Sequence, residues 1–134
     1  MNSGAAMKLL SEKILHTLVR AESCQLTEHC RALGKRWKRL LNTTEILHDT
    51  NDLNVTLANA SIYLEAFGHL VMSWIWLEQA ITADKAQRDD HAFYASKRQA
   101  CDWFFRWELP RVDAQLDLLD SLDKTTLNMQ DDWF

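Results

Sequence analysis

The chain has 134 residues, 47% of them hydrophobic, which fits one domain with a single core. Its net charge of -4 gives no general attraction to nucleic acid or to an anionic membrane. Three glycines and one proline are too few turn-formers for a β-rich fold, so the composition predicts helices with short connections. The three cysteines are odd in number and lack metal or redox spacing, so we interpret them as free thiols in a reducing, cytoplasmic compartment: Cys24, Cys30 and Cys101.

Two helices are predicted in the first 50 residues. Residues 1–6 are expected to be a disordered end, and leucine and isoleucine at every fourth position predict a first helix over residues 7–22. A heptad pattern then predicts a bundle-forming helix over residues 23–48, with Ser23 as its candidate N-cap. The heptad positions are Leu26, Cys30, Leu33, Trp37, Leu40, Thr44 and Leu47. One continuous helix through Glu22 and Ser23 is the alternative.

The chain is organised around a central apolar segment, predicted as a helix over residues 52–86 with Asn51 or Asp52 as its N-cap. Large apolar residues recur at spacings of three and four and predict a broad buried face that other helices surround. This face consists of Leu57, Ala60, Leu64, Phe67, Val71, Trp74 and Ile81, widened by Tyr63, Leu70 and Leu77. Gly68 either admits a close neighbour or is simply tolerated at a cost of about 1 kcal/mol. The segment also contains charged residues, so no membrane span is predicted.

A last helix is predicted over residues 91–121. One face continues through the proline: Tyr94, Arg98, Cys101, Phe105, Leu109, Val112, Leu116 and Leu119. A proline inside a helix removes a hydrogen bond, which predicts a kink at Pro110 or two nearly collinear helices. The tail, residues 122–134, ends in Trp133 and Phe134 and is either a docking segment or a disordered end. The sequence thus predicts an all-α fold, a single antiparallel up-and-down four-helix bundle over residues 1–134.

A basic run occupies the outer face of the heptad helix, consisting of Arg31, Lys35, Lys38 and Arg39, with Arg36 nearby. It is either a face that is solvated or paired within the fold, or a docking surface for an anionic partner. An acidic ladder follows on the last helix at Asp113, Asp117 and Asp120, with Asp131 and Asp132 in the tail. We therefore predict that these charges serve contacts between helical domains, within the fold or across a homodimer, rather than binding nucleic acid.

No catalytic, cofactor-binding or metal-ligating residues are predicted. Glu45 and His48 form one Glu-x-x-His, whereas a di-iron bundle needs this motif on two helices plus two inward carboxylates. Two other pairs share a helix face without making a second copy: Glu12 with His16, and Glu65 with His69. Cys101 has no nearby base, since the nearest histidine in sequence is His91. The chain also has no glycine-rich phosphate loop and no nucleophile elbow.

Two segments, NASIYLEAFGHLVMSWIWLEQA (59–80) and AFYASKRQACDWFFRWELP (92–110), carry a family resemblance. Together they resemble the extra C-terminal helical domain of bacterial acyl-CoA dehydrogenases, in the group that includes the methylthiopropanoyl-CoA dehydrogenase type. The matching features keep their order and spacing: Asn59-Ala60, Tyr63-Leu64, Phe67-Gly68, Trp74, Trp76-Leu77, Gln79-Ala80, Phe93-Tyr94, Lys97, Phe104-Phe105 and Leu109-Pro110. The family tends to have Ala-Arg where this chain has Cys101-Asp102, and often an acid where it has Arg111.

The resemblance implies an accessory domain of an FAD-dependent acyl-CoA dehydrogenase, whose intact form performs α,β-dehydrogenation of acyl-CoA in fatty acid metabolism. In that family, FAD, substrate and the catalytic carboxylate belong to domains that precede this one, and no matched position is a catalytic or flavin-binding residue. The chain is therefore expected to bind no cofactor itself and to support packing on the catalytic domains or homo-oligomerisation. The alternatives are a stand-alone interaction module that uses the basic face of residues 31–39, and a helical ligand-binding protein with an aromatic pocket.

Overall fold

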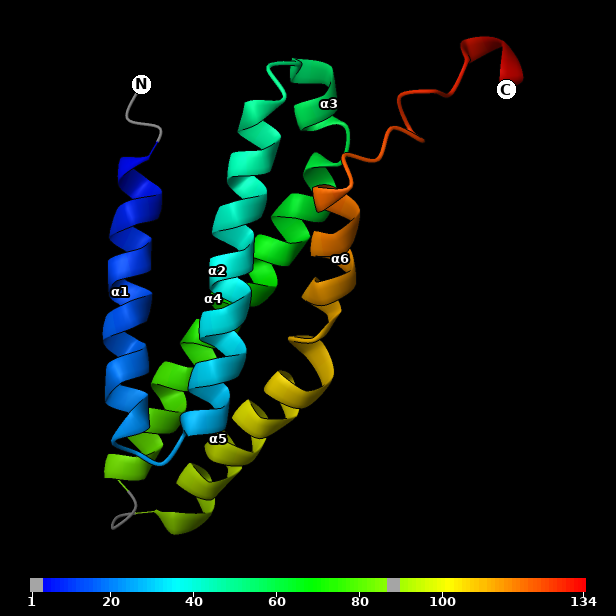
Figure 1. Cartoon of the computed structure of the whole chain (residues 1–134). Coiled ribbons are helices and arrows are strands. Elements are labelled where there is room, and N and C mark those ends of the chain that lie inside the picture. The colour runs from blue at the N-terminus through cyan, green and yellow to red at the C-terminus, as the bar shows by residue number, and fades with distance from the viewer. Residues whose placement is uncertain (1–3, 87–89) are drawn as a thin grey trace.

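The computed structural model describes residues 4–86 and 90–134, most of which lie in helices joined by short turns (Figure 1). The α-helices are α1 (Ala5–Glu22), α2 (Thr27–Asp49), α3 (Leu53–Leu57), α4 (Ala60–Lys85), α5 (His91–Trp103) and α6 (Arg111–Asp120). A π-helical turn, η1 (Phe104–Glu108), separates α5 from α6, and a 3-10 turn, η2 (Asp131–Trp133), lies in the tail. The described residues contain no β-strand, so the predicted all-α class is confirmed.

Helix α4 is the central element and contacts α1, α2, α5, η1 and α6. Along the chain, α1 and α4 run down the view of Figure 1, whereas α2 and the segment from α5 to α6 run up it. Four uninterrupted helices are not confirmed, because two of the predicted helices are broken. The central one divides into α3 and α4 at residues 58–59, and the last one divides into α5, η1 and α6. No helix among the described residues is long and apolar enough to cross a membrane.

A residue in the left-handed backbone region occurs in the connection between α1 and α2 and in the connection between α2 and α3. Gln25 has φ = 60°, which an α-helix does not accommodate, so α2 begins at Thr27 and not at Ser23. One continuous helix through this point is therefore ruled out. Asn51 has φ = 52°, and Asp52 is the N-cap that follows, where its side chain accepts hydrogen bonds from the backbone N–H groups of Asn54 and Val55. Asp52 thus caps the short helix α3, and α4 starts separately after it.

The buried face of α4 differs from the predicted stripe. Its fully buried positions form a heptad in which small and large residues alternate: Ala66, Leu70, Ser73, Leu77 and Ala80, followed by Ile81 and Ala83. Leu64, predicted to be buried, is 69% exposed, and Leu57 is exposed as well. Because α4 is apolar on nearly all sides, the spacing of its large residues does not select one face. The small residues select it, because only they allow neighbouring helices to approach closely.

The irregularity in the last helical stretch precedes the proline. The backbone N–H of Leu109 donates to the carbonyl of Phe104 at 2.9 Å, a bond that spans five residues and closes the π turn. Pro110 has an ordinary helical φ of -61° and stands at the start of α6, where a missing N–H leaves no bond unmade. A kink at Pro110 is therefore not confirmed. The predicted apolar positions are buried on both sides of the turn: Cys101, Phe105, Leu109, Val112, Leu116 and Leu119.

Candidate interaction surfaces

The acidic ladder of α6 pairs with part of the basic run of α2. Arg36 makes a two-bond contact with the carboxylate of Asp113, at 3.0 and 2.9 Å. Arg39 reaches Asp117 at 2.9 Å and Asp120 at 3.1 Å, and Asp120 also accepts a short hydrogen bond from Thr43. These charges join two helices of one chain, as the interpretation of pairing within the fold requires.

The remaining cations of α2 face outward. Arg31, Lys35 and Lys38 are exposed, and within residues 4–86 and 90–134 no ion pair involves any of them. The basic face is therefore smaller than the sequence suggests, three cations rather than five. It remains available to an anionic partner.

The histidine and carboxylate pairs found in the sequence do not converge. Glu45 and His48 are both exposed, as are Glu12 and His16. His69 faces Glu108 through Nε2 at 3.2 Å, and its Nδ1 lies 3.1 Å from the backbone carbonyl of Glu65. In the described part of the chain, no three histidine, cysteine or acidic side chains gather as a metal site would need. Glu108 also accepts from Arg111 at 3.1 Å, and Arg111 and then His69 hold the pKa of this carboxyl below its usual value.

The surroundings of the three cysteines favour the thiol form over the nucleophilic thiolate. Cys101 is fully buried, and burial raises its pKa to about 12. Burial likewise raises the pKa of Cys24 and of Cys30, and the Cys30 thiol donates to the carbonyl of Leu18 at 3.3 Å. The thiolate is the reactive form of cysteine, so none of these groups is poised for covalent chemistry at neutral pH.

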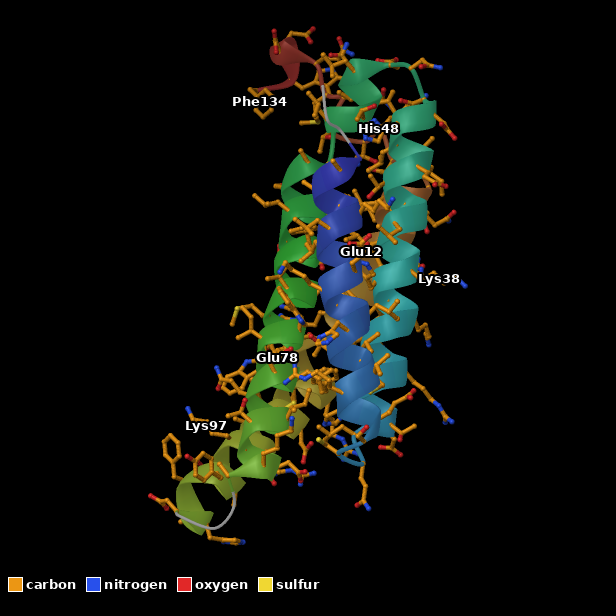
Figure 2. The ribbon with its side chains drawn as sticks, turned by 90° about the vertical axis from the view of Figure 1, so that its left-hand side faces the viewer. Glu12, Lys38, His48, Glu78, Lys97 and Phe134 are labelled. Carbon is orange, nitrogen blue, oxygen red and sulfur yellow. The ribbon has the colours of Figure 1, made fainter. Side chains whose placement is uncertain are left out.

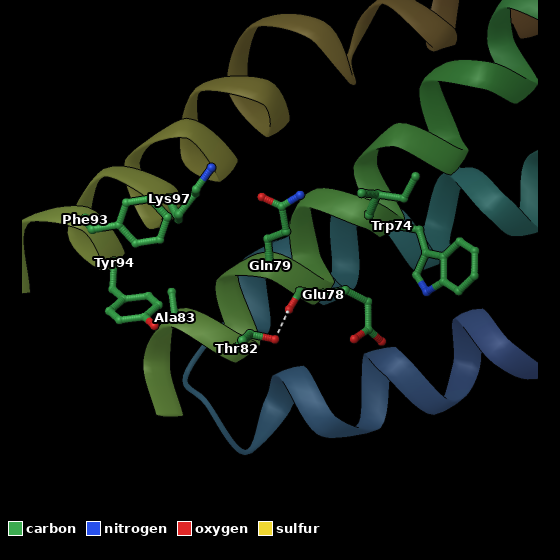
Figure 3. Close-up of a pocket in the computed structure, with 9 residues that line it drawn as sticks. Trp74, Glu78, Gln79, Thr82, Ala83, Phe93, Tyr94 and Lys97 are labelled. Atoms are coloured by element: carbon green, nitrogen blue, oxygen red, sulfur yellow. Dashed lines mark hydrogen bonds between the residues drawn. The ribbon is translucent and has the colours of Figure 1, made fainter. Parts of the chain in front are cut away.

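An apolar groove of about 380 Å³ lies between α4 and α5 (Figure 3). Ile75, Gln79 and Thr82 line it from α4, and Phe93 and Lys97 line it from α5. The Lys97 ammonium sits 5.2 Å from the centre of the Phe93 ring, at the edge of the groove. Its volume falls in the range of about 300–1,000 Å³ usual for ligand sites. The lining is mainly hydrocarbon with one cation, which suits an apolar or aromatic group that carries a negative charge.

The carboxylate that lines this groove, Glu78, is already paired with a cation. Glu78 accepts from Thr17 at 2.6 Å and from Arg20 at 2.7 Å, both on α1. Trp74 Nε1 in turn donates to the Thr17 hydroxyl at 2.7 Å. Burial alone would raise the pKa of Glu78, but the bonds from Thr17 and Arg20 outweigh burial and lower it. Glu78 therefore stays ionised and ties α4 to α1.

A second apolar surface is the outer face of α4, defined here as Leu64, Gly68, Val71, Met72 and Ile75. These residues share one side of the helix; Leu64, Met72 and Ile75 are exposed and Val71 is half-buried. The α4 side of the molecule, on the left of Figure 2, is open. A Cβ added at Gly68 would meet nothing within 4 Å, so no neighbour among the described residues explains that glycine. This face carries no charge and no element of the described chain covers it.

A third surface feature is a hollow between the start of α2 and the segment from the end of α5 to η1. The His29 ring stacks on Phe105 with centroids 4.4 Å apart, and its Nε2 lies 2.6 Å from the carboxylate of Asp102. Trp103 and Trp107 line the same hollow and are largely exposed. The sequence alone does not predict the pairing of His29 with Asp102, because the two residues are far apart along the chain and become neighbours only where the start of α2 meets the end of α5.

The tail projects away from the bundle in Figure 1. Its body contacts are few: Asn59 Nδ2 donates to the carbonyl of Asp123 at 2.9 Å, and Thr126 donates to the carbonyl of Ala58 at 3.4 Å. Beyond them the tail exposes its large apolar residues, which are Leu127, Met129, Trp133 and Phe134.

Comparison with known proteins gives one match. Residues 10–130, from α1 into the tail, match the model of the family described as acetyl-CoA dehydrogenase C-terminal like. The chain belongs to this family. No curated protein and no solved structure matches the chain.

Membership of the acetyl-CoA dehydrogenase C-terminal-like family confirms that residues 59–110 resemble a C-terminal helical domain of acyl-CoA dehydrogenases, and it extends the resemblance to most of α1 and to α2. The residues expected to depart from the family pattern, Cys101-Asp102 and Arg111, flank η1. Asp102 faces His29, and Arg111 pairs with Glu108. Asp102 and Arg111 thus change the surface around η1, whereas Cys101 is fully buried in the core.

Proposed function

We propose that this chain is the C-terminal accessory domain of an FAD-dependent acyl-CoA dehydrogenase of the methylthiopropanoyl-CoA dehydrogenase type. It packs on the catalytic domains of that cytoplasmic enzyme of fatty acid metabolism and has no active site of its own. Its long helical stretches, α1, α2, α4 and α5–α6, act there as one up-and-down bundle. The intact enzyme carries out the α,β-dehydrogenation of an acyl-CoA.

The outer face of α4 is the observation that carries this proposal. A helix that is apolar on nearly all sides is normally buried on nearly all sides, whereas the described chain leaves the outer face of α4 uncovered. Contiguous exposed apolar surface marks protein contact sites. Family membership supplies the partner, since the domain is named for acyl-CoA dehydrogenases.

FAD belongs to the parent enzyme in this proposal, because the residues of this chain do not fit it. A flavin pyrophosphate is held by several cations or by a loop of backbone N–H groups. In the described residues the groove between α4 and α5 offers one cation, Lys97, and no such loop. The purified chain is therefore expected to bind no FAD and to dehydrogenate no acyl-CoA with an artificial electron acceptor. Stoichiometric flavin after reconstitution, or turnover, would contradict this.

The test of the docking role uses the catalytic domains. A flavin-domain sequence is expected in the reading frame upstream of Met1. The intact enzyme is then produced as a double variant that carries both Leu64→Arg and Met72→Arg. Because two charges would then face the apolar partner surface, we expect loss of assembly and a lower specific activity. Leu15→Arg, at an equally exposed apolar position on α1, is the matched control and should change neither. Unchanged assembly in the double variant would exclude the outer face as the contact.

The alternative is a stand-alone module that uses the basic face, and the outward Arg31, Lys35 and Lys38 are the observation in its favour. Binding of DNA, RNA or an acidic protein through these cations should weaken steeply with salt. Lys35→Glu with Lys38→Glu should abolish it. Tight, salt-sensitive binding by the unchanged chain, lost in this variant, would favour the module over the accessory domain.

A further inference from the structure

The molecule carries an unfilled groove and an unpartnered tail whose chemistries match. The groove between α4 and α5 presents hydrocarbon and aromatic surface with a cation at its edge. The tail presents Trp133 and Phe134, which are 65% and 93% exposed, directly after Asp131 and Asp132. Exposed aromatic side chains of this size are typical of residues that anchor a protein contact by filling a pocket on the partner.

The charges of the two features are complementary. Lys97 is the cation of the groove and makes no ion pair among the described residues. The carboxylate that also lines the groove, Glu78, is held by Arg20 and offers little repulsion. An aromatic residue of the tail seated in the groove would place Asp131 or Asp132 near the Lys97 ammonium. Gln79 and Thr82 at the groove offer polar groups to the backbone of an incoming segment.

The tail does not suit the groove of its own molecule. Asn59 holds Asp123 at the beginning of α4, and Gln79, in the groove, is 20 residues further along that helix, about 30 Å away. Ten residues from Asp123 to Trp133 span at most about 35 Å when fully extended. The tail is not extended, because Asn128 bonds back to Lys124 and η2 forms another turn. Figure 2 shows Phe134 at one end of the molecule and Lys97 near the other.

We propose that the occupant of the groove is the tail of a second copy of this chain. Trp133 and Phe134 of each copy insert between α4 and α5 of the other, and Asp131 and Asp132 pair with Lys97 there. Two copies placed antiparallel bring each tail beside the other's groove, and the reciprocal exchange closes as a two-fold dimer.

This inference deepens the proposed accessory role, which it rests on for its biological setting, by naming how the domains associate with one another. Apart from Ile75, which borders both surfaces, it uses different residues from the contact with the catalytic domains, which is assigned to the outer face of α4. The isolated chain is enough to test it. Failure of the dimer assay therefore leaves the docking role standing, and failure of docking leaves the dimer standing.

Sedimentation equilibrium of the full chain over a range of concentrations is the primary measurement, and the unchanged chain is expected to dimerise. Trp133→Ala with Phe134→Ala should raise the dimer dissociation constant by more than about 30-fold, the effect of losing one interface hot spot. Trp107→Ala is the matched control, since Trp107 is 67% exposed and lies outside both tail and groove. It should leave the dissociation constant unchanged. Far-UV circular dichroism should show the same helix content in all variants.

Charge reversal then tests the pairing itself. Lys97→Glu alone and Asp131→Lys with Asp132→Lys alone should each weaken the dimer, whereas the triple variant should restore most of the affinity. Restoration distinguishes direct contact from a change in net charge.

Three results would overturn the proposal. The unchanged chain could remain monomeric, whether its tail is free or folded onto its own surface. The dimer could survive loss of Trp133 and Phe134, which would place the interface elsewhere. The tail variants could weaken the dimer while Lys97→Glu does not and the triple variant shows no rescue, which would seat the tail on another surface.

Discussion

Two leucines six residues apart on α4 separate its buried face from its outer face. Leu70 is fully buried in the core, whereas Leu64 is 69% exposed. Changing either one to alanine removes the same atoms from the same helix, so the two variants differ only in burial. Leu70→Ala should cost about 3–5 kcal/mol, because it removes transfer free energy and leaves a cavity. Leu64→Ala should stay within about 0.5 kcal/mol of the unchanged chain, as exposed substitutions usually do.

Urea unfolding of the isolated chain, followed by far-UV circular dichroism and tryptophan fluorescence, measures this difference. The dependence of the unfolding free energy on urea should be the same for both variants, so that midpoint shifts report stability alone. Working at protein concentrations too low for self-association keeps binding out of the measurement. If Leu64→Ala were as costly as Leu70→Ala, α4 would be rotated so that its stripe of large residues faces the core, and the assignment of the outer face would be refuted.

Three further outcomes follow from the contacts. The pKa of Glu78 is lowered in the folded chain, so its contribution to the unfolding free energy is present above the ordinary carboxyl pKa and is lost as the pH falls through the folded value. Glu78→Gln should therefore flatten the acid side of a stability profile measured by urea melts from pH 7 to pH 3. An unchanged profile would mean that the bond to Arg20 contributes nothing to stability. Cys101, with a pKa of about 12 and no exposure, should resist iodoacetamide at pH 8 until urea unfolds the chain, as mass spectrometry would show, and rapid native labelling would contradict its burial. Arg36→Ala should lower the unfolding free energy in urea melts by about 1–2 kcal/mol, because it removes two charged hydrogen bonds made by a side chain that is 11% exposed. Lys38→Ala should change it by no more than about 0.5 kcal/mol. Equal effects of the two variants would contradict the pairing between α2 and α6.

The periodicity of α2 and of the last helical stretch was enough to predict which residues face the core. In both stretches the apolar positions alternate with charged ones, so a single stripe stands out and burial follows it. Six of the seven predicted positions of α2 are buried, and the exception is a shift from Thr44 to its neighbour Thr43. The family resemblance lay in residues 59–80 and 92–110, because the order and spacing of their aromatic residues can be read without coordinates.

The orientation of α4, the position of the irregularity near Pro110 and the pairing of His29 with Asp102 were decided by tertiary packing. A helix that is apolar on nearly all sides has no single stripe to read, and the small residues Ala66, Ser73 and Ala80 set its buried side only because other helices must come close. The π turn at Phe104–Glu108 places the break before the proline, where a local rule puts it at the proline. His29 meets Asp102 only in the folded chain, because the two residues are far apart in sequence and neither belongs to the charge runs that predicted the pairing of α2 with α6.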